Sequence, residues 1–217
     1  MKNPIDNYWD LKLESVKENL ENNNFEVYTA SSADHAKDLA LNDIIPQLNA
    51  KSVSWGGSMS FVATGLFHVL KDDKNMEVLN TFDKTLEFED QMELRRKSLL
   101  TDLFITGTNA VTESGQLVNL DMIGNRVSAI TWGPKNVLLF IGRNKICPDL
   151  DDAMLRIKNY AAPVNTMNLD KNTPCREKGF CHDCSSPDRI CNTWTITEKC
   201  FPKKRIKVVL INEDLGF

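Results

Sequence analysis

Four cysteines lie close together near the C-terminal end of the chain, with the spacing C-x5-C-x2-C-x6-C. They are Cys175, Cys181, Cys184 and Cys191. Four thiolates within one loop can ligate a tetrahedral zinc ion or a 4Fe–4S cluster. Basic neighbours such as Arg189 favour ionised thiols. The spacing differs from the ferredoxin pattern C-x2-C-x2-C-x3-C, so zinc, an iron–sulfur cluster and an empty reduced cluster all stay open.

The other two cysteines and one histidine have less specific patterns. Cys147 follows an apolar run and is expected to be a small buried side chain, whereas Cys200 either replaces one of the four ligands or lies in the core. His182 is a weaker ligand candidate because it stands between two of the cysteines. The N-terminal residues lack the apolar core of a signal peptide, which predicts a cytoplasmic location and disfavours disulfides.

A glycine-serine turn is the second feature with chemical potential. A predicted short strand over residues 51–55 runs directly into Gly56, Gly57, Ser58 and Ser60, and a helical pattern follows. Glycines allow a ligand to approach the backbone, and serine hydroxyls with helix-start amides bind anions. The turn matches neither the Walker motif nor G-x-G-x-x-G. An anion site and a simple serine-capped turn are both consistent with it.

A third group of polar residues follows a buried strand predicted over residues 103–106. The candidates for binding an anionic substrate are Gly107, Thr108, Asn109, Asn125 and Arg126. A guanidinium group can clamp a carboxylate or a phosphate. Glu113 is the candidate general base or nucleophile, although Glu113-Ser-Gly also has the composition of a hairpin turn, which is the simpler interpretation.

The periodicity of the chain predicts the elements that position these residues. Strand and helix patterns alternate through the first half, which predicts an α/β fold with a mostly parallel sheet and helices on both faces. Shorter strands after residue 110 predict a smaller antiparallel region. The apolar residues 205–212 predict a closing strand that re-enters the main sheet. Residues 1–217 then form one domain, and residues 171–202, the cysteine-rich segment, form a loop before its last strand.

Composition excludes several classes of protein. The chain is 41% hydrophobic and 26% charged, with a net charge of −4, so no overall positive field attracts nucleic acid or an anionic membrane. A basic run at residues 203–207 beside the cysteines suggests a zinc module that binds nucleic acid, but it is short and the molecule is acidic. The longest compact apolar run, residues 137–141, is too short to span a bilayer.

Several of these stretches together resemble one known family. The runs 112–121, 124–127, 132–134 and 141–145, together with the Gly-Gly-Ser-x-Ser turn, are similar to the LUD (lactate-utilisation) domain family over about residues 5–217. The resemblance implies a fold like that of sugar-phosphate isomerase and CoA-transferase-like enzymes, in which the turn after an early strand holds a phosphate or related anion. Family members act in bacterial lactate oxidation beside iron–sulfur and other redox components, which favours iron–sulfur over zinc.

Two functions follow as hypotheses. In the first, the protein binds a small anionic metabolite that bears a phosphate, a carboxylate or a CoA ester, and takes part in organic-acid oxidation with an iron–sulfur cluster. In the second, it is a non-catalytic electron-transfer or scaffold subunit whose cysteines hold a structural zinc ion or a cluster. Redox proteins are further expected partners, and neither a membrane nor nucleic acid is expected.

Overall fold

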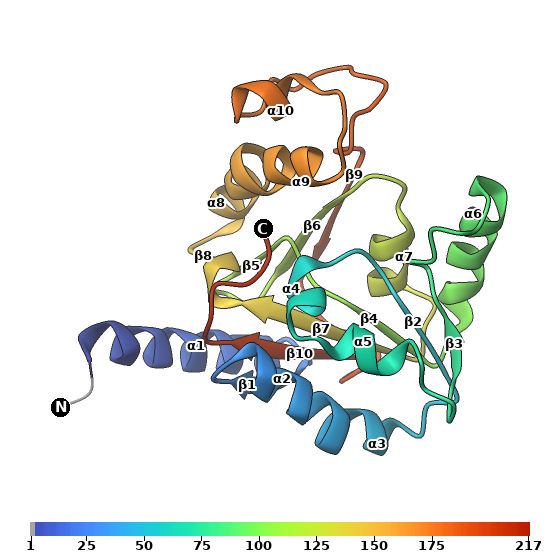
Figure 1. Cartoon of the computed structure of the whole chain (residues 1–217). Helices are drawn as coiled ribbons and strands as arrows, with labels where there is room; N and C mark the ends of the chain where they lie inside the picture. Colours follow the sequence, from blue (N-terminus) through green and yellow to red (C-terminus); the bar gives the residue numbers. More distant parts are fainter. Residues whose placement is uncertain (1–2) are drawn as a thin grey trace.

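A six-stranded parallel sheet forms the centre of the molecule (Figure 1). The computed structural model describes residues 3–217. The strands of this main sheet are β1 (Glu26–Ala30), β2 (Ser52–Trp55), β3 (Glu77–Leu79), β4 (Leu103–Thr106), β7 (Asn136–Gly142) and β10 (Ile206–Ile211). Their order is β1-β10-β7-β4-β2-β3, and every neighbouring pair is parallel. The predicted parallel sheet is confirmed, and the last strand enters it between β1 and β7.

The central strands are apolar on both faces because helices cover both. In β7, Val137, Leu139 and Ile141 contribute to one core cluster, while Leu138 and Phe140 contribute to the other. This alternation follows from the two-residue period of a strand. All five side chains are fully buried, as expected for a central parallel strand.

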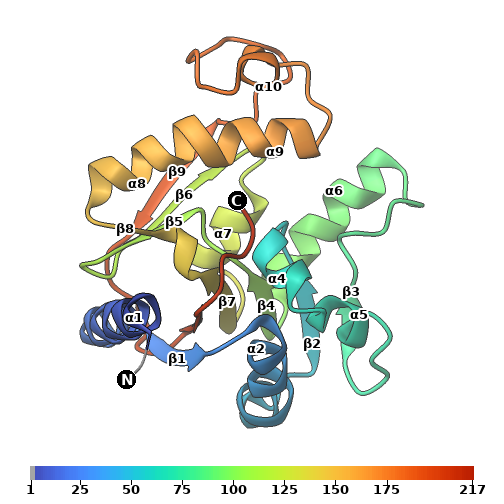
Figure 2. The ribbon, with the colours of Figure 1, turned by 60° about the vertical axis from the view of Figure 1, so that its left-hand side comes forward.

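Different helices cover the two faces of the main sheet. On one face lie α1 (Pro4–Asn22) and α7 (Asn125–Thr131). On the other lie α2 (Ala33–Leu39), α3 (Ile45–Leu48), α4 (Met59–Ala63) and α5 (Leu66–Leu70). The Oδ1 atom of Asn3 accepts a hydrogen bond from the Ile5 amide and so caps α1, and Pro4 occupies its first turn. A further helix, α6 (Phe88–Lys97), stands beyond the β3 end of the sheet (Figure 2).

A second, smaller sheet lies above the ends of the main sheet. It contains β8 (Ile146–Cys147), β5 (Ala110–Thr112), β6 (Leu117–Asp121) and β9 (Thr193–Thr197), in that order. The β5–β6 and β6–β9 pairs are antiparallel, as predicted for this region, and β5–β8 is parallel. Helix α8 (Leu150–Arg156) packs on this sheet and continues through a π-helical turn, residues 157–161, into α9 (Ala162–Asn168).

The cysteine-rich segment is only partly a loop. It begins with a short helix, α10 (Pro174–Lys178), which lies beyond α9 at the edge of the molecule (Figure 2). Its later part supplies β9, which pairs with β6 along five residues. The segment therefore leaves the domain and returns to the second sheet before β10 closes the main sheet. Across residues 3–217, the helices are too short or too polar to span a membrane.

Candidate functional site

A cavity of about 500 Å³ lies beyond the carboxyl ends of the main-sheet strands. Its floor comes from the residues that follow β2, β4 and β7, and its walls come from α6, α7 and the π-turn with α9. Residues from two distant stretches of sequence meet there: Gly57, Ser58, Gly107, Thr108, Asn109, Asn125 and Arg126. Seven of the nine residues predicted to bind an anion therefore line one pocket.

The strand order explains why the cavity forms here. After β2 the chain adds β3 on one side, then returns to place β4 on the other side of β2 and continues toward β7 and β10. The connections that follow β2 and β4 thus lead in opposite directions along the sheet, which is a reversal of strand order. In open α/β sheets, such a reversal leaves a crevice at the carboxyl ends of the strands, and ligands bind there.

The two turns approach each other closely. A Cβ atom added at Gly107 would lie 2.4 Å from Ser58 Oγ and 3.0 Å from the Phe140 carbonyl oxygen, so only glycine fits at this position. Ser58 is the N-cap of α4, and its Oγ accepts a hydrogen bond from the Phe61 amide. A Cβ atom at Gly57 would meet no atom within 4 Å, which leaves the backbone of this turn open to the cavity.

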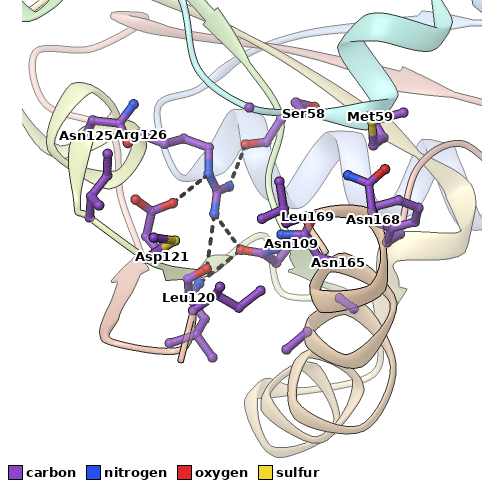
Figure 3. A pocket seen from close by; sticks show the side chains of 18 of the residues that line it. Ser58, Met59, Asn109, Leu120, Asp121, Asn125, Arg126, Asn165, Asn168 and Leu169 are labelled. Atoms are coloured by element: carbon purple, nitrogen blue, oxygen red, sulfur yellow. Dashed lines mark hydrogen bonds and ion pairs between the residues drawn. The ribbon is translucent and has the colours of Figure 1, made fainter. Parts of the chain in front are cut away.

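Arg126 holds the polar wall of the pocket together (Figure 3). The guanidinium group donates from Nε to Asp121 Oδ1 (3.0 Å), from Nη1 to Asn119 Oδ1 (2.8 Å) and from Nη2 to Asn109 Oδ1 (2.8 Å). It also donates to the carbonyl oxygens of Gly107 and Leu120. All five N–H groups of the side chain are thus used within the protein. Arg126 contributes positive charge and rigidity to the pocket, and its donors already have partners.

Two of the predicted anion-binding residues lie behind the pocket. Gly56 lies against the side chains of Phe104 and Arg126, where an added Cβ would be 3.1 Å from Phe104 Cζ and 3.2 Å from Arg126 Cγ, closer than ordinary van der Waals contact. Ser60 is fully buried, and its Oγ donates to the Leu215 carbonyl oxygen at 2.8 Å. Ser60 therefore fixes the C-terminal segment, residues 212–217, against α4.

The structure adds three basic residues that were not among the predicted binding residues, although Lys145 ends the run 141–145 that resembles the LUD domain family. Lys145, at the end of the turn after β7, lines the pocket although its exposed fraction is only 4%. Lys84 and Arg95 line it from the side of α6. Arg95 makes long hydrogen bonds of 3.4 Å to Gln91, and neither side chain has a carboxylate partner among residues 3–217. In sequence, these residues resemble an ordinary solvated helix face and loop.

Glu113 lies outside the pocket. Its Oε1 atom is 2.6 Å from Lys12 Nζ of α1, and its backbone carbonyl accepts from Asn19 Nδ2. The following Gly115 has φ +83°, and an added Cβ there would lie 2.9 Å from the α1 backbone. This arrangement is the hairpin turn that the sequence also suggested, and it ties the β5–β6 hairpin to α1. A catalytic role for Glu113 stays a prediction.

The predicted metal ligands are near one another but do not converge. Cys175 is buried, and its Sγ lies 3.3 Å from Thr173 Oγ1. Cys191 lines the main pocket, whereas Cys184 lines a separate shallow cavity. Burial raises the pKa of the Cys191 thiol, nearby Lys158 and Arg189 lower it, and nearby Cys181 and Cys175 raise it. Within residues 3–217, no three His, Cys, Asp or Glu side chains are arranged to hold a metal ion.

Cys147 and Cys200 are also explained by their surroundings. Cys147 is buried in the core between α8 and the second sheet, and burial raises the pKa of its thiol. Cys200 is buried beside α1 and the start of β10, and its Sγ accepts a hydrogen bond from the Ile206 amide. The expectation that Cys147 is a small buried side chain is confirmed, and Cys200 lies in the core.

Together, fold and cavity define an α/β protein with a ligand-sized pocket, polar on one wall, at the carboxyl ends of a parallel sheet. A family model for the LUD domain matches residues 13–211. The chain belongs to the LUD domain family. No curated protein sequence matches it. Among solved structures it is similar to a DUF162 family protein from Deinococcus radiodurans, with 14% identity, a TM-score of 0.49, and coverage of 94% of this chain and 97% of that one.

Proposed function

We propose that the pocket binds a small organic molecule carrying a carboxylate or phosphate group, as part of the oxidation of an organic acid. The observation that supports this most strongly is an excess of basic groups in the pocket of an acidic chain. Its charged lining side chains are Lys84, Arg95 and Arg126 against Asp83 and Asp121, and Lys145 adds a further basic group, whereas the whole chain has a net charge of −4.

The acidic groups in the lining are already satisfied. Asp121 is paired with Arg126, and Asp83 accepts hydrogen bonds from the amide and hydroxyl of Thr85. Arg95 and Lys84 lack a carboxylate partner within residues 3–217, so their positive charge is available to a ligand. A guanidinium group provides paired donors that match a carboxylate or phosphate. Arg95 is therefore the residue we assign to recognition of the anionic group.

The size and remaining lining of the cavity suit a metabolite. A volume of about 500 Å³ is within the usual range for small-molecule sites. Apolar side chains such as Met59, Leu120 and Ile157 line part of it, and Asn165 and Asn168 offer amides from α9. Ser58 and the backbone of Gly57 face the same space. Such a mixture of an apolar wall and a few placed polar groups orients a ligand.

Calorimetric titration with inorganic phosphate, L-lactate and pyruvate tests this proposal. We expect at least one of these anions to bind and Ser58→Ala to weaken it about fivefold, since one neutral hydrogen bond contributes about 1 kcal/mol. Ser32→Ala is the matched control, because Ser32 caps α2 in the same way but lies outside the pocket lining. The proposal fails if none of these anions binds the parent protein, or if both variants bind as the parent does.

A second function, metal or cluster binding by the cysteine-rich segment, is supported by the mutual influence of three thiols. Cys175, Cys181 and Cys191 are close enough for the first two to raise the pKa of the third, after the effect of burial and against that of Lys158. Cys184 would complete a set of four soft donors suited to an iron–sulfur cluster or zinc. The loop between residues 179 and 190 would have to close around the group.

Metal analysis of protein purified without oxygen separates the outcomes. Iron with a brown absorption spectrum that is lost in Cys181→Ser supports a cluster and a redox partner. About one zinc per chain with no colour supports a structural site. Protein without either metal contradicts this second function and leaves the pocket proposal unaffected.

A further inference from the structure

Lys145 occupies an unusual position for a lysine. It ends the short turn Arg143–Lys145 after β7, where the carboxyl end of the strand meets the pocket. Its Nζ donates to the Thr108 carbonyl oxygen at 3.0 Å. The C-terminal segment covers it from the other side, since a Cβ atom added at Gly216 would lie 3.3 Å from Nζ. The amine is thus enclosed by protein, in a residue that lines the pocket.

The electrostatic surroundings of the Lys145 amine are also unusual. Within residues 3–217, Lys145 takes part in no ion pair, and its one hydrogen-bond partner is a neutral carbonyl. The charged groups that face it are the guanidinium groups of Arg156 on α8 and Arg126 on α7. The carboxylate of Asp121 on β6 is engaged by Arg126 and by the Gly124 amide. A buried ammonium group with two cationic neighbours is strongly disfavoured.

The consequence is a neutral amine near physiological pH. Burial, followed by repulsion from Arg156 and Arg126, lowers the pKa of Lys145 to about 7. An ordinary lysine carries a lone pair in only a small fraction of molecules at this pH, whereas Lys145 is largely unprotonated slightly above it. Desolvated lysines near other cations are the amines that react with carbonyl compounds.

We propose that Lys145 is a nucleophile that forms an imine with a small anionic aldehyde or ketone bound in the pocket. The proposal rests on the anion-binding function above, which brings the carbonyl compound to the amine. The lone pair of Nζ attacks the carbonyl carbon, a C–N bond forms as the C=O π bond breaks, and a proton passes through solvent from the nitrogen to the carbonyl oxygen to give a carbinolamine. Loss of water then leaves the C=N bond. Addition of water reverses the sequence, so the step consumes no oxidant or reductant.

Reductive trapping tests the proposal on the parent protein. Glyoxylate, which carries an aldehyde and a carboxylate, is added at about pH 8 and the imine is reduced with sodium borohydride. Peptide mass spectrometry then locates the carboxymethyl group. We expect Lys145 to be labelled at least about tenfold faster than any surface lysine, because more of it is unprotonated. Its labelling rate should level off above about pH 8, while that of surface lysines keeps rising.

Variants and a second probe separate the outcomes. Lys145→Arg should abolish labelling at this site, and Lys135→Arg, an exposed residue outside the pocket lining, should leave it unchanged. Propionaldehyde, which lacks the carboxylate, should label Lys145 more slowly than glyoxylate does. Labelling spread evenly over surface lysines overturns the proposal. If glyoxylate competes with lactate but Lys145 stays unlabelled, the imine is excluded and anion binding stands. If glyoxylate and propionaldehyde label Lys145 at equal rates and no anion binds, the proposal that the substrate is anionic is wrong.

Discussion

The pocket and the cysteine-rich segment both gather reactive side chains, but they hold them differently. In the pocket, Arg126 is fully hydrogen-bonded, only 7% exposed and joined to a buried carboxylate. In the cysteine-rich segment, Arg189 is a third exposed and joins the carbonyls of Cys184 and Cys191 to an exposed aspartate. The polar side chains of the pocket are therefore held in fixed positions, whereas the thiols would have to move to bind one metal ion or cluster. Preorganisation lowers the cost of binding, which makes the pocket the better candidate for chemistry in the free protein.

Replacing the central arginine of each region tests this contrast most strongly. Arg126→Met removes the ion-pair partner of the buried Asp121 carboxylate and leaves it only the hydrogen bond from the Gly124 amide; breaking a buried ion pair in this way costs about 3–5 kcal/mol of unfolding free energy. Arg189→Met removes bonds that solvent can replace and is expected to cost about 1 kcal/mol. Urea unfolding of both variants measures the difference. Equal losses would show that the two regions are equally well held.

The pH dependence of stability gives the next largest effect. The pKa of Lys145 is lowered from 10.5 to about 7 in the folded protein, so between these values the unfolded chain binds more protons. Stability of the parent protein therefore rises with pH in this window, and below about pH 7 the full cost of the buried amine is present. Lys145→Met lacks this titration.

The unfolding free energy of Lys145→Met minus that of the parent protein should thus fall by roughly 4 kcal/mol between about pH 6 and about pH 10. Urea unfolding of the parent and the variant at each pH measures it. If the difference in unfolding free energy is constant with pH, Lys145 has an ordinary pKa and the contrast between the two regions loses its electrostatic basis.

Replacing two glycines of the pocket should have a smaller effect on stability, caused by steric contact. Gly107→Ala places a methyl group against Ser58 Oγ and the Phe140 carbonyl, and such overpacking costs about 1–3 kcal/mol. Gly57→Ala meets nothing within 4 Å and should change stability by less than about 0.5 kcal/mol. Thermal unfolding of the pair compares them. A costly Gly57→Ala with a neutral Gly107→Ala would mean that the two turns are packed differently from this structure.

The smallest effect is expected in the cysteine-rich segment. Asp183 Oδ1 forms ion pairs with Lys158 Nζ at 2.8 Å and with Arg189 Nη2 at 3.4 Å, but the Asp183 side chain is mostly exposed. Exposed ion pairs contribute little and are screened by salt. Asp183→Asn, which also tolerates the local φ of +46°, should leave the urea midpoint unchanged within error. A clear decrease in the urea midpoint that added salt does not reduce would show that these ion pairs stabilise the cysteine-rich segment more than we infer.

Much of the fold could be predicted because it depends on local patterns. The apolar runs of β7 and β10 indicate strands buried on both faces, and the glycine-serine turn after β2 marks a strand-to-helix connection. Strand β9 was missed, although Thr193–Thr197 is rich in β-branched residues that indicate a strand.

The candidate site was predicted in part, for a physical reason. Ser58 and Asn109 carry local signals, since glycine and small polar residues follow their strands. The unusual state of Lys145 depends on Arg126, Arg156 and Gly216, which are far from it in sequence or reach it only through the strand order. Arg95 likewise becomes a pocket residue only because α6 folds beside the strand ends. No spacing along the chain encodes these long-range contacts.

Calorimetric titration of the parent protein, Arg95→Met and Arg96→Met with whichever of phosphate, L-lactate and pyruvate binds the parent most tightly tests the central claim most directly. Arg95 lines the pocket, whereas its neighbour Arg96 is 69% exposed and pairs with Glu93 outside the pocket lining. Because a charge-assisted hydrogen bond contributes about 1.5–3 kcal/mol, Arg95→Met should weaken binding at least about tenfold. Arg96→Met should bind as the parent does. Equal affinity in all three proteins would contradict the assignment of the pocket as an anion site.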